Sequence, residues 1–522
     1  MDELERSSER VAAVFIALMS LLTLAALSAP RYEQERLAAA QAADVAPIMP
    51  VVEVWLSTTG GKLRLAPQPH LAMAARGDAP VDIAIDVDAR YQTVTGFGAA
   101  MTDASAWLIR NRLDESHRQA LLRELYGPPP GLNFNMMRLT IGASDFSLNL
   151  YTLDDIPFGE SDQELRYFNV AANLRDLIPT VRDVLAVNPG LLIVASPWSA
   201  PAWMKDSQNL IGGELLPEYE SAFADYLIKY VDTYRSHGIP IFALTLQNEP
   251  AFSPISYPGM LMGAATRARI IANYLGPKLA KRKQRTRILD WDHNWSHPEQ
   301  PLAVLGDPAA APYVDGVAWH CYEGSQHAQG RVHREHPDKD AYITECSGGD
   351  WSLNMNGELL WAARNLLVTG MRQWARGVIY WNLALDENHG PHFGGCTLCN
   401  GVITIDSVSG EVTRTDEYYA LAHFSRFVLP GAFRVRSTDT DADKGIANVA
   451  FQNVSDDSVV LVMVNIRKEA RTVSVAQGQT RFEYTMPAES VATLTWNPNP
   501  VGVWMRRALG WLGRPGVPPG TD

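Results

Sequence analysis

Two short segments hold the residues of this chain whose types could do chemistry. LTLQNEP presents Glu249, and AYITECSGG presents Glu345. Each segment is an apolar run that ends in polar residues, as the strands of an α/β barrel do. Two carboxylates at the ends of separate strands can cleave a glycosidic bond, because one can donate a proton while the other acts as nucleophile or base. Taken singly, either glutamate could instead cap its strand or pair with an arginine.

Eight apolar segments alternate with helical stretches and predict the scaffold that positions these two glutamates. Amphipathic helices are expected at 219–237 and 266–283. Eight parallel strands with helical crossovers predict an α/β fold with a closed (β/α)8 TIM barrel over residues 91–427. Glu249 then ends the fourth strand and Glu345 the seventh, at the barrel end where chemistry takes place. The predicted strands are 95–101, 135–142, 191–199, 242–250, 287–295, 316–322, 341–347 and 377–385.

The segments before and after the barrel have a different periodicity. Residues 428–498 alternate apolar and polar positions with a period of two, between turns rich in Asp, Asn and Gly. This pattern predicts an antiparallel β-sandwich. Residues 51–90 have the same character, so we expect their strands to join that side domain.

The two ends of the chain suggest contact with a membrane. Residues 1–30 contain the apolar run Val11–Ala29, which is long for a signal peptide and just long enough to span a bilayer. We interpret it as an export signal, cleaved or retained as an anchor, rather than as a buried core helix. Residues 31–50 are Ala-rich and read as a linker. The tail 499–522 is either a short amphipathic membrane helix or a frayed end. The protein is therefore expected to be periplasmic or secreted.

Composition and cysteines narrow the class of protein. The 522 residues carry a net charge of -13 without a basic stripe, which disfavours a nucleic-acid partner.

Export would permit disulfides among Cys321, Cys346, Cys396 and Cys399. Disulfides or free thiols are favoured over zinc, and alternation places Cys321 and Cys346 on neighbouring strands, facing away from the cleft. No His/Asp/Glu cluster with ligand spacing is visible in the sequence, so we expect neither a metal nor another cofactor.

Seven segments, taken in order, resemble the signature segments of glycoside hydrolase family 30. The resemblance covers about residues 91–425, and the flanking β segments fit the side domain of that family. It implies retaining hydrolysis, with Glu249 on strand 4 as acid/base and Glu345 on strand 7 as nucleophile, and a pKa of Glu249 raised by the nearby Glu345. The segments are YQTVTGFGAAMTDASAWLI, NMMRLTIGASDFS, SPWSAPAWMKD, LQNEP, WHCY, TECSGG and YWNLALDENHGPHFGG.

The same resemblance implies which residues hold the sugar. Asn248 would hydrogen-bond the 2-hydroxyl, and Asp103 would accept hydrogen bonds from other sugar hydroxyls. Trp198 and Trp381 would wall the pocket, although either tryptophan could be plain barrel packing.

Three more residues are expected to support the catalytic pair. Arg138 lies inside an apolar strand and would hold the catalytic carboxylates, or else form a purely structural ion pair. Tyr322 shares a strand face with His320 and is expected to hydrogen-bond Glu345. His320 itself is expected to be mainly structural.

The expected substrate is a β-linked glucoside, in a glycolipid or a glucan. The main reading is a β-glucosidase of glucosylceramidase type. The alternatives are an endo-β-1,6-glucanase or xylan-active enzyme on the same scaffold, and an inactive carbohydrate-binding protein. This chain departs from the family pattern at two places: Cys321 replaces an aromatic residue, and the GGCTLC loop is an insertion beside the site. The preference of the enzyme for a particular aglycone therefore stays open.

Overall fold

The computed structural model describes residues 49–498, apart from 283–285 and 352–357. The predicted export segment 1–30, nearly all of the linker 31–50 and the tail 499–522 lie outside the described residues. Among the helices that the structure does describe, none is long and apolar enough to span a bilayer.

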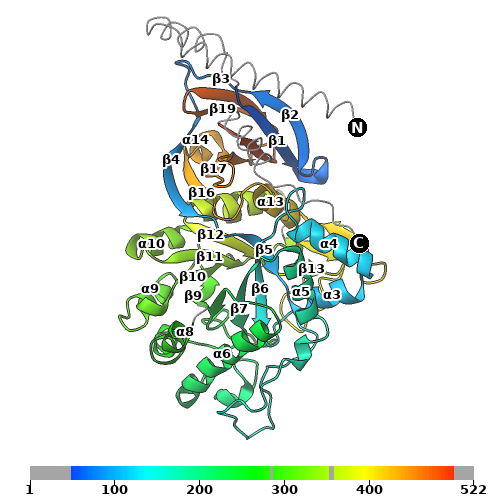
Figure 1. Cartoon of the computed structure of the whole chain (residues 1–522), viewed down its shortest axis with the longest axis vertical. Coiled ribbons are helices and arrows are strands. Elements are labelled where there is room, and N and C mark those ends of the chain that lie inside the picture. The colour runs from blue at the N-terminus through cyan, green and yellow to red at the C-terminus, as the bar shows by residue number, and fades with distance from the viewer. Residues whose placement is uncertain (1–48, 283–285, 352–357, 499–522) are drawn as a thin grey trace, which may run out of the picture. The chain divides into compact units, whose positions relative to one another are not determined.

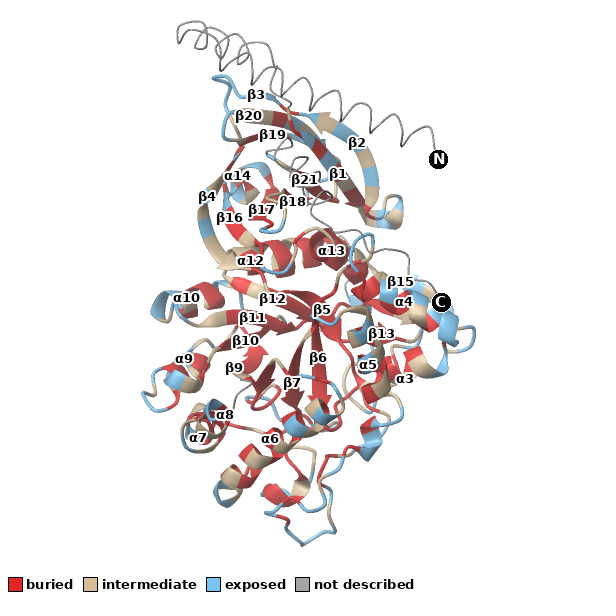
Figure 2. Ribbon diagram, viewed as in Figure 1, coloured by how far each residue is buried: buried red, intermediate tan, exposed pale blue. Residues whose placement is uncertain are grey.

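Eight parallel strands close into a barrel, which confirms the predicted fold class (Figure 1). Consecutive strands are neighbours throughout, and the last pairs with the first. Figure 2 shows that these strands are buried, in line with their uniformly apolar sequences. The strands are β5 (Gly96–Ala100), β6 (Met136–Ile141), β7 (Leu192–Pro197), β8 (Ala243–Thr245), β9 (Arg287–Asn294), β10 (Gly316–His320), β11 (Asp340–Glu345) and β12 (Ala375–Tyr380).

The barrel interior is filled by side chains that the alternating strands turn inward. Gly98 shows how close the backbones are, because a Cβ atom at this position would lie 1.8 Å from the carbonyl oxygen of Met136 on the next strand. The buried cluster at the centre consists of Met136, Val194, Ala243, Leu289, Ala318, Tyr342 and Ile379.

Helices follow most of the strands and cover the barrel. The helix predicted at 219–237 is α6 (Glu220–Ser236). The one predicted at 266–283 is α7 (Ala264–Ile270), continued by a π-helical turn, η5 (Ile271–Leu275), and α8 (Gly276–Ala280). The others are α3 (Asp103–Asn111), α4 (Glu115–Tyr126), α5 (Leu177–Val187), α9 (Glu299–Leu305), α10 (His327–Glu335), α11 (Glu358–Trp361) with η8 (Ala362–Thr369) and α12 (Gly370–Arg372), and α13 (Asp416–Ser425).

The flanking β segments combine into one sheet system, as their period predicts. Its order is β2-β1-β21-β18-β17-β16-β4-β19-β20-β3, so strands from before and after the barrel alternate in it. The strands are β1 (Val51–Thr58), β2 (Ala66–Ala72), β3 (Ala74–Ala75), β4 (Ile83–Thr93), β16 (Phe433–Ser437), β17 (Ile446–Gln452), β18 (Val459–Asn465), β19 (Arg471–Gln477), β20 (Thr480–Met486) and β21 (Ser490–Trp496).

A buried histidine joins the barrel to this β domain. His423 on α13 contacts Ser57 Oγ at 2.9 Å on β1 and Thr493 Oγ1 at 2.8 Å on β21. Burial lowers the pKa of His423 to about 3, so the ring is neutral and serves as a donor and an acceptor. The β domain is thereby fixed to the helix that precedes it.

Candidate active site

Glu249 and Glu345 lie together at the carboxyl ends of the barrel strands. Glu345 is the last residue of β11, and Glu249 follows β8 in the left-handed backbone region, with φ of 46°. His320 Nδ1 lies 3.0 Å from Glu249 Oε1 and 3.9 Å from Glu345 Oε1. His320 thus brings the two carboxylates into one site, as a pair acting on one glycosidic bond requires.

Arg138 is fully buried on β6 and holds the nucleophile candidate. Its guanidinium forms an ion pair with Glu345 Oε2 and donates to Asn248 Oδ1 and Asp292 Oδ2, both at 2.8 Å. Burial opposes the charge, but Asp292 and Glu345 raise the pKa of Arg138 above its ordinary value. The arginine therefore stays charged and fixes Glu345 and Asn248 in one geometry.

Asp292 on β9 is the centre of this network, and sequence reasoning missed it. It is fully buried, and burial opposes its charge, but Arg138 and His320 hold its pKa well below the usual range. An aspartate between two tryptophans in an apolar strand was the available signal. Its carboxylate accepts hydrogen bonds from the side chains of Arg138, Ser196, Thr245, His320 and Thr344.

His320 connects Asp292 to the acid/base candidate. It donates through Nδ1 to Glu249 Oε1 and through Nε2 to Asp292 Oδ1, each at 3.0 Å. Burial lowers the pKa of His320, but Glu345, Asp292 and Glu249 together raise it to about 9. The ring is therefore an imidazolium at neutral pH, in direct contact with Glu249.

The expected direction of the Glu249 pKa was wrong. Burial raises this pKa, but the hydrogen bond and charge of His320, followed by the charges of His293 and Arg138, lower it below its ordinary value. The sequence-based prediction of this pKa included only repulsion by Glu345, because His320 was expected to be structural. In the free protein the proton that Glu249 would deliver is held on the histidine side of the hydrogen bond.

The predicted pocket residues meet beside the carboxylates. The rings of Trp198 and Trp381 stack at 4.9 Å, and Arg138 lies over both. Tyr322 donates from its hydroxyl to Glu345 Oε1 at 2.9 Å, the contact expected from strand alternation. With Asn248 held by Arg138, these side chains surround the space next to Glu345.

Asp103 makes its contacts elsewhere, and its role in binding the sugar stays a prediction. It begins α3, and its carboxylate accepts hydrogen bonds from Ser147 Oγ at 2.7 Å and Tyr151 OH at 2.8 Å. It lines a separate cavity of about 340 Å³ whose other walls include Arg175 and Asp176. Burial raises the pKa of Asp103 to about 6.

Asp145 is the additional acid that the site does contain. Burial, and the charges of Glu345 and Glu249, raise the pKa of Asp145 well above its usual range, while Trp381 hydrogen-bonds it. Among the described residues its buried Oδ1 has no hydrogen-bond partner. A buried polar atom left open toward two carboxylates indicates a position for a ligand hydroxyl. The sequence offered it in GASDFS, four residues after β6.

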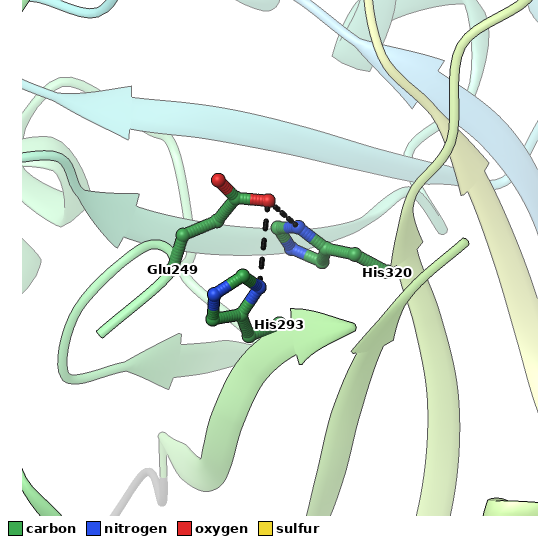
Figure 3. Close-up of side chains that lie close together, drawn as sticks. All are labelled: Glu249, His293 and His320. Carbon is green, nitrogen blue, oxygen red and sulfur yellow. Dashed lines mark hydrogen bonds and ion pairs between the residues drawn. The ribbon is translucent and has the colours of Figure 1, made fainter. Parts of the chain in front are cut away.

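Three ligand-type side chains converge on the acid/base candidate (Figure 3). Glu249, His293 and His320 bring one oxygen and two nitrogens within 4.8 Å of one another. This cluster could not be seen in the sequence. The residues follow or belong to β8, β9 and β10, so their convergence depends on strand order and leaves no local spacing in the sequence.

All four cysteines are in disulfides. Cys321 pairs with Cys346 on the next strand, as their shared orientation suggested. Cys396 pairs with Cys399 in the loop after β12. Cys399 packs in the same small core as Trp198 and Trp381, so this disulfide shapes one wall of the pocket.

Comparisons with known proteins match both parts of the chain. Residues 94–428 match the glycosyl hydrolase family 30 TIM-barrel domain, and residues 431–494 match the family 30 beta sandwich domain. An endo-1,6-beta-D-glucanase of Neurospora crassa is 37% identical over 390 residues, which are 72% of this chain and 79% of that protein. The lysosomal acid glucosylceramidase of Mus musculus is 28% identical over 441 residues, 79% of this chain and 83% of that protein. The solved structure of an endo-beta1,6-glucanase superposes with a TM-score of 0.77 and 29% identity, over 85% of this chain and 99% of that one.

Proposed function

The chain belongs to glycosyl hydrolase family 30 and is a glycoside hydrolase, and on this premise we propose that it is a retaining endo-β-1,6-glucanase. Relatives named endo-1,6-beta-D-glucanase from Neurospora crassa and Aspergillus fumigatus share 37% and 35% identity with it. The mouse glucosylceramidase shares 28%. These values favour the glucan-cleaving alternative over the glucosylceramidase-type reading of the sequence.

The main support for a two-carboxylate mechanism is that Glu249 and Glu345 both lie next to His320. In the first step Glu345 attacks the anomeric carbon and the bond to the leaving oxygen breaks, while Glu249 donates a proton to that oxygen. The proton reaches Glu249 along its 3.0 Å hydrogen bond with His320. Arg138 and Tyr322 keep the Glu345 carboxylate oriented for attack.

The second step reverses these roles. Glu249, now a carboxylate, removes a proton from water, and the resulting hydroxide attacks the anomeric carbon and releases Glu345. Two inversions at that carbon give net retention of configuration. His320 can take the proton back from Glu249 at the end of the cycle, which restores the resting arrangement.

The pocket residues bind the sugar that is attacked. Asn248 is held by Arg138 so that its amide can donate to the 2-hydroxyl, and Asp145 can accept from a hydroxyl further round the ring. The stacked pair Trp198 and Trp381 supplies an apolar wall for a sugar face.

Three exposed aromatic side chains lie on segments that contact or follow site residues and could bind further sugars of a polymer. Phe252 follows Glu249, and its N–H donates to the carbonyl of that glutamate at 2.9 Å. Phe393 donates from its N–H to the carbonyl of Asp145 at 2.6 Å, and Trp351 lies shortly after β11. Their exposed fractions are 46%, 40% and 49%. The same groups could contact a lipid tail, which is the observation that favours glucosylceramide as a second candidate substrate.

A substrate comparison separates the two candidates. Purified protein is incubated with linear β-1,6-glucan, glucosylceramide in detergent, xylan and an aryl β-glucoside. We expect β-1,6-glucan to give a ladder of short β-1,6-linked oligosaccharides early in the reaction. Glucose as the only product from glucan, or turnover of glucosylceramide alone, would contradict the endo-glucanase proposal while leaving the two-carboxylate mechanism intact.

We further propose that the protein is exported and partly membrane-bound. The support is the apolar run Val11–Ala29 and the tail, whose Trp504, Arg506, Arg507 and Trp511 could contact a membrane if the tail forms a helix. Deleting residues 1–30 should move most of the protein from the membrane fraction to the soluble fraction, and deleting 501–522 as well should release the remainder. Full-length protein found wholly in the cytoplasm would overturn this proposal.

A further inference from the structure

Glu249, His293 and His320 present three ligand atoms to one point beside the catalytic acid (Figure 3). Glu249 Oε1 lies 3.0 Å from His320 Nδ1 and 3.5 Å from His293 Nδ1. In a tetrahedral zinc site with bonds of roughly 2.0–2.1 Å, neighbouring ligand atoms are about 3.4 Å apart. The two observed spacings bracket this value, and all three ligand atoms lie within 4.8 Å of one another.

His293 supplies a second, independent observation. Its side chain is only 9% exposed, and its Nδ1 has no hydrogen-bond partner among the residues that the structure describes. A buried ring nitrogen without a partner is costly, and this one points at the carboxylate of Glu249. The nitrogen is therefore available to a ligand without breaking any existing hydrogen bond.

His320 has the support that a metal-binding histidine needs. Its second nitrogen, Nε2, is hydrogen-bonded at 3.0 Å to Asp292 Oδ1, and Asp292 is itself anchored by Arg138 and Thr344. Carboxylate–histidine–metal chains of this kind fix the ring and increase its basicity toward a cation. Two imidazoles and one carboxylate suit Zn²⁺, Cu²⁺ or Ni²⁺, whereas Mg²⁺ and Ca²⁺ prefer oxygen ligands.

We propose that a divalent transition-metal cation binds to Glu249, His293 and His320 and reversibly inhibits the enzyme. On binding, the cation displaces one proton from His320 Nδ1 and occupies a lone pair of Glu249 Oε1. His320 then has no proton to pass to Glu249, and coordination lowers the basicity of the Glu249 carboxylate toward water. The cation is thus a regulator of the hydrolase rather than its cofactor.

The binding test uses the full chain, stripped of metal and in a buffer without reductant or phosphate. Titration calorimetry with Zn²⁺ should show one equivalent bound, and activity should fall as that equivalent is added and return with EDTA. Mg²⁺ and Ca²⁺ should have neither effect. Anomalous diffraction at the zinc edge should place the ion between the three side chains. Absence of stoichiometric zinc binding, or an ion located elsewhere, would overturn the proposal.

A variant pair connects the binding to this cluster. His293→Gln removes one ligand and should weaken Zn²⁺ binding at least as much as loss of a supporting residue does, roughly 10- to 100-fold. Inhibition is scored against the metal-free rate of each variant. His117→Gln is the matched control, because His117 is an exposed histidine that also pairs with a carboxylate, Asp114, at 2.8 Å. Native-like zinc affinity in His293→Gln would refute the site.

If His293→Gln does not fold, Glu249→Gln replaces it, with calorimetry alone as the readout. The amide oxygen carries no charge, so zinc binding should again weaken by at least roughly 10-fold. Undiminished binding in this variant would overturn the proposal. Because calorimetry needs no substrate, either result is independent of which glucoside the enzyme cleaves.

Discussion

The two ends of the barrel use the same chemical groups in opposite ways. At the amino ends of the strands, Asp340 accepts from Arg287 at 2.8 Å through one oxygen and from Arg376 at 2.6 Å through the other. At the carboxyl ends, Arg138 pairs with Asp292 and Glu345, while His320 connects Asp292 to Glu249. Both clusters are arginine–carboxylate networks that span several strands.

The difference lies in what each network leaves unpaired. At the amino end both oxygens of Asp340 have arginine partners. At the carboxyl end the buried atoms Asp145 Oδ1, His293 Nδ1 and Arg138 Nε have no hydrogen-bond partner among the described residues. A closed network contributes to stability, whereas buried atoms left open are positions for a ligand. The functional end therefore differs from the other end by its unpaired buried polar atoms rather than by its charge.

Among changes at the carboxyl ends of the strands, Glu345→Gln should reduce activity most. Without a nucleophile no glycosyl-enzyme can form, so kcat on every substrate should fall by at least roughly 10⁴-fold. Rates on an aryl β-glucoside and on β-1,6-glucan test this, with the melting temperature as a check on folding. A residual rate within tenfold of the native one would remove Glu345 from its assigned role.

Glu249→Ala should have the next largest effect, and it should depend on the leaving group. General acid catalysis contributes roughly 10²–10⁴-fold, and a poor leaving group depends on it most. Turnover of glucan should therefore fall much more than the glycosylation rate of an activated aryl glucoside. Added azide should partly restore turnover and give the β-glycosyl azide. Formation of the α-azide, or equal losses for all leaving groups, would argue against Glu249 as acid/base.

Asp145→Asn tests whether the open carboxyl oxygen binds sugar. We expect kcat/KM to fall roughly 2- to 10-fold, the value of one lost hydrogen bond of about 0.5–1.5 kcal/mol. The melting temperature should not fall, because the variant removes a buried ionisable group that lies near two carboxylates. Unchanged kcat/KM would show that Asp145 is only part of the wall.

Asp340→Asn tests the arginine–carboxylate network at the amino ends of the strands. Both arginine contacts lose their charged partner, so the melting temperature should fall by roughly 1–2 °C, which corresponds to about 1–2 kcal/mol for a chain of this size. Activity at 25 °C should be unchanged, since this cluster lies at the opposite ends of the strands from the carboxylate pair. A large loss of kcat with no loss of stability would break the distinction between the two ends.

Asp103→Asn should have the smallest effect on catalysis and a pH-dependent effect on stability. The folded-state pKa of Asp103, about 6, lies above the ordinary 3.8, so folding favours the protonated acid. Its contribution is present at low pH and is lost as pH rises through about 6. The variant should therefore gain more thermal stability relative to the native protein at pH 7.5 than at pH 4.5. The opposite pH trend would contradict the burial argument, and a large loss of kcat/KM would restore Asp103 to the sugar pocket.

Sequence reasoning located the elements and the catalytic pair but not their electrostatics. The eight strands and both glutamates could be predicted because each is marked locally, by an apolar run that ends in polar residues. The roles of Asp292 and His293 depend on side chains from other strands, such as Arg138 on β6 and His320 on β10, which a linear pattern does not display. Asp145 was not predicted because nothing in the local segment GASDFS shows that it lies near Glu345 and Glu249 in the folded chain. The pKa of Glu249 was misjudged because its sign depends on His320, a contact between residues 71 positions apart.

Trapping of the covalent intermediate tests the central claim most directly. A 2-deoxy-2-fluoro-β-glucoside with a good leaving group slows the second step, so the glycosyl-enzyme accumulates on the native protein. Peptide mass spectrometry should find one fluoroglucosyl group per chain, on Glu345 in the segment AYITECSGG. A label on any other residue, or steady hydrolysis with inversion and no label, would contradict the account.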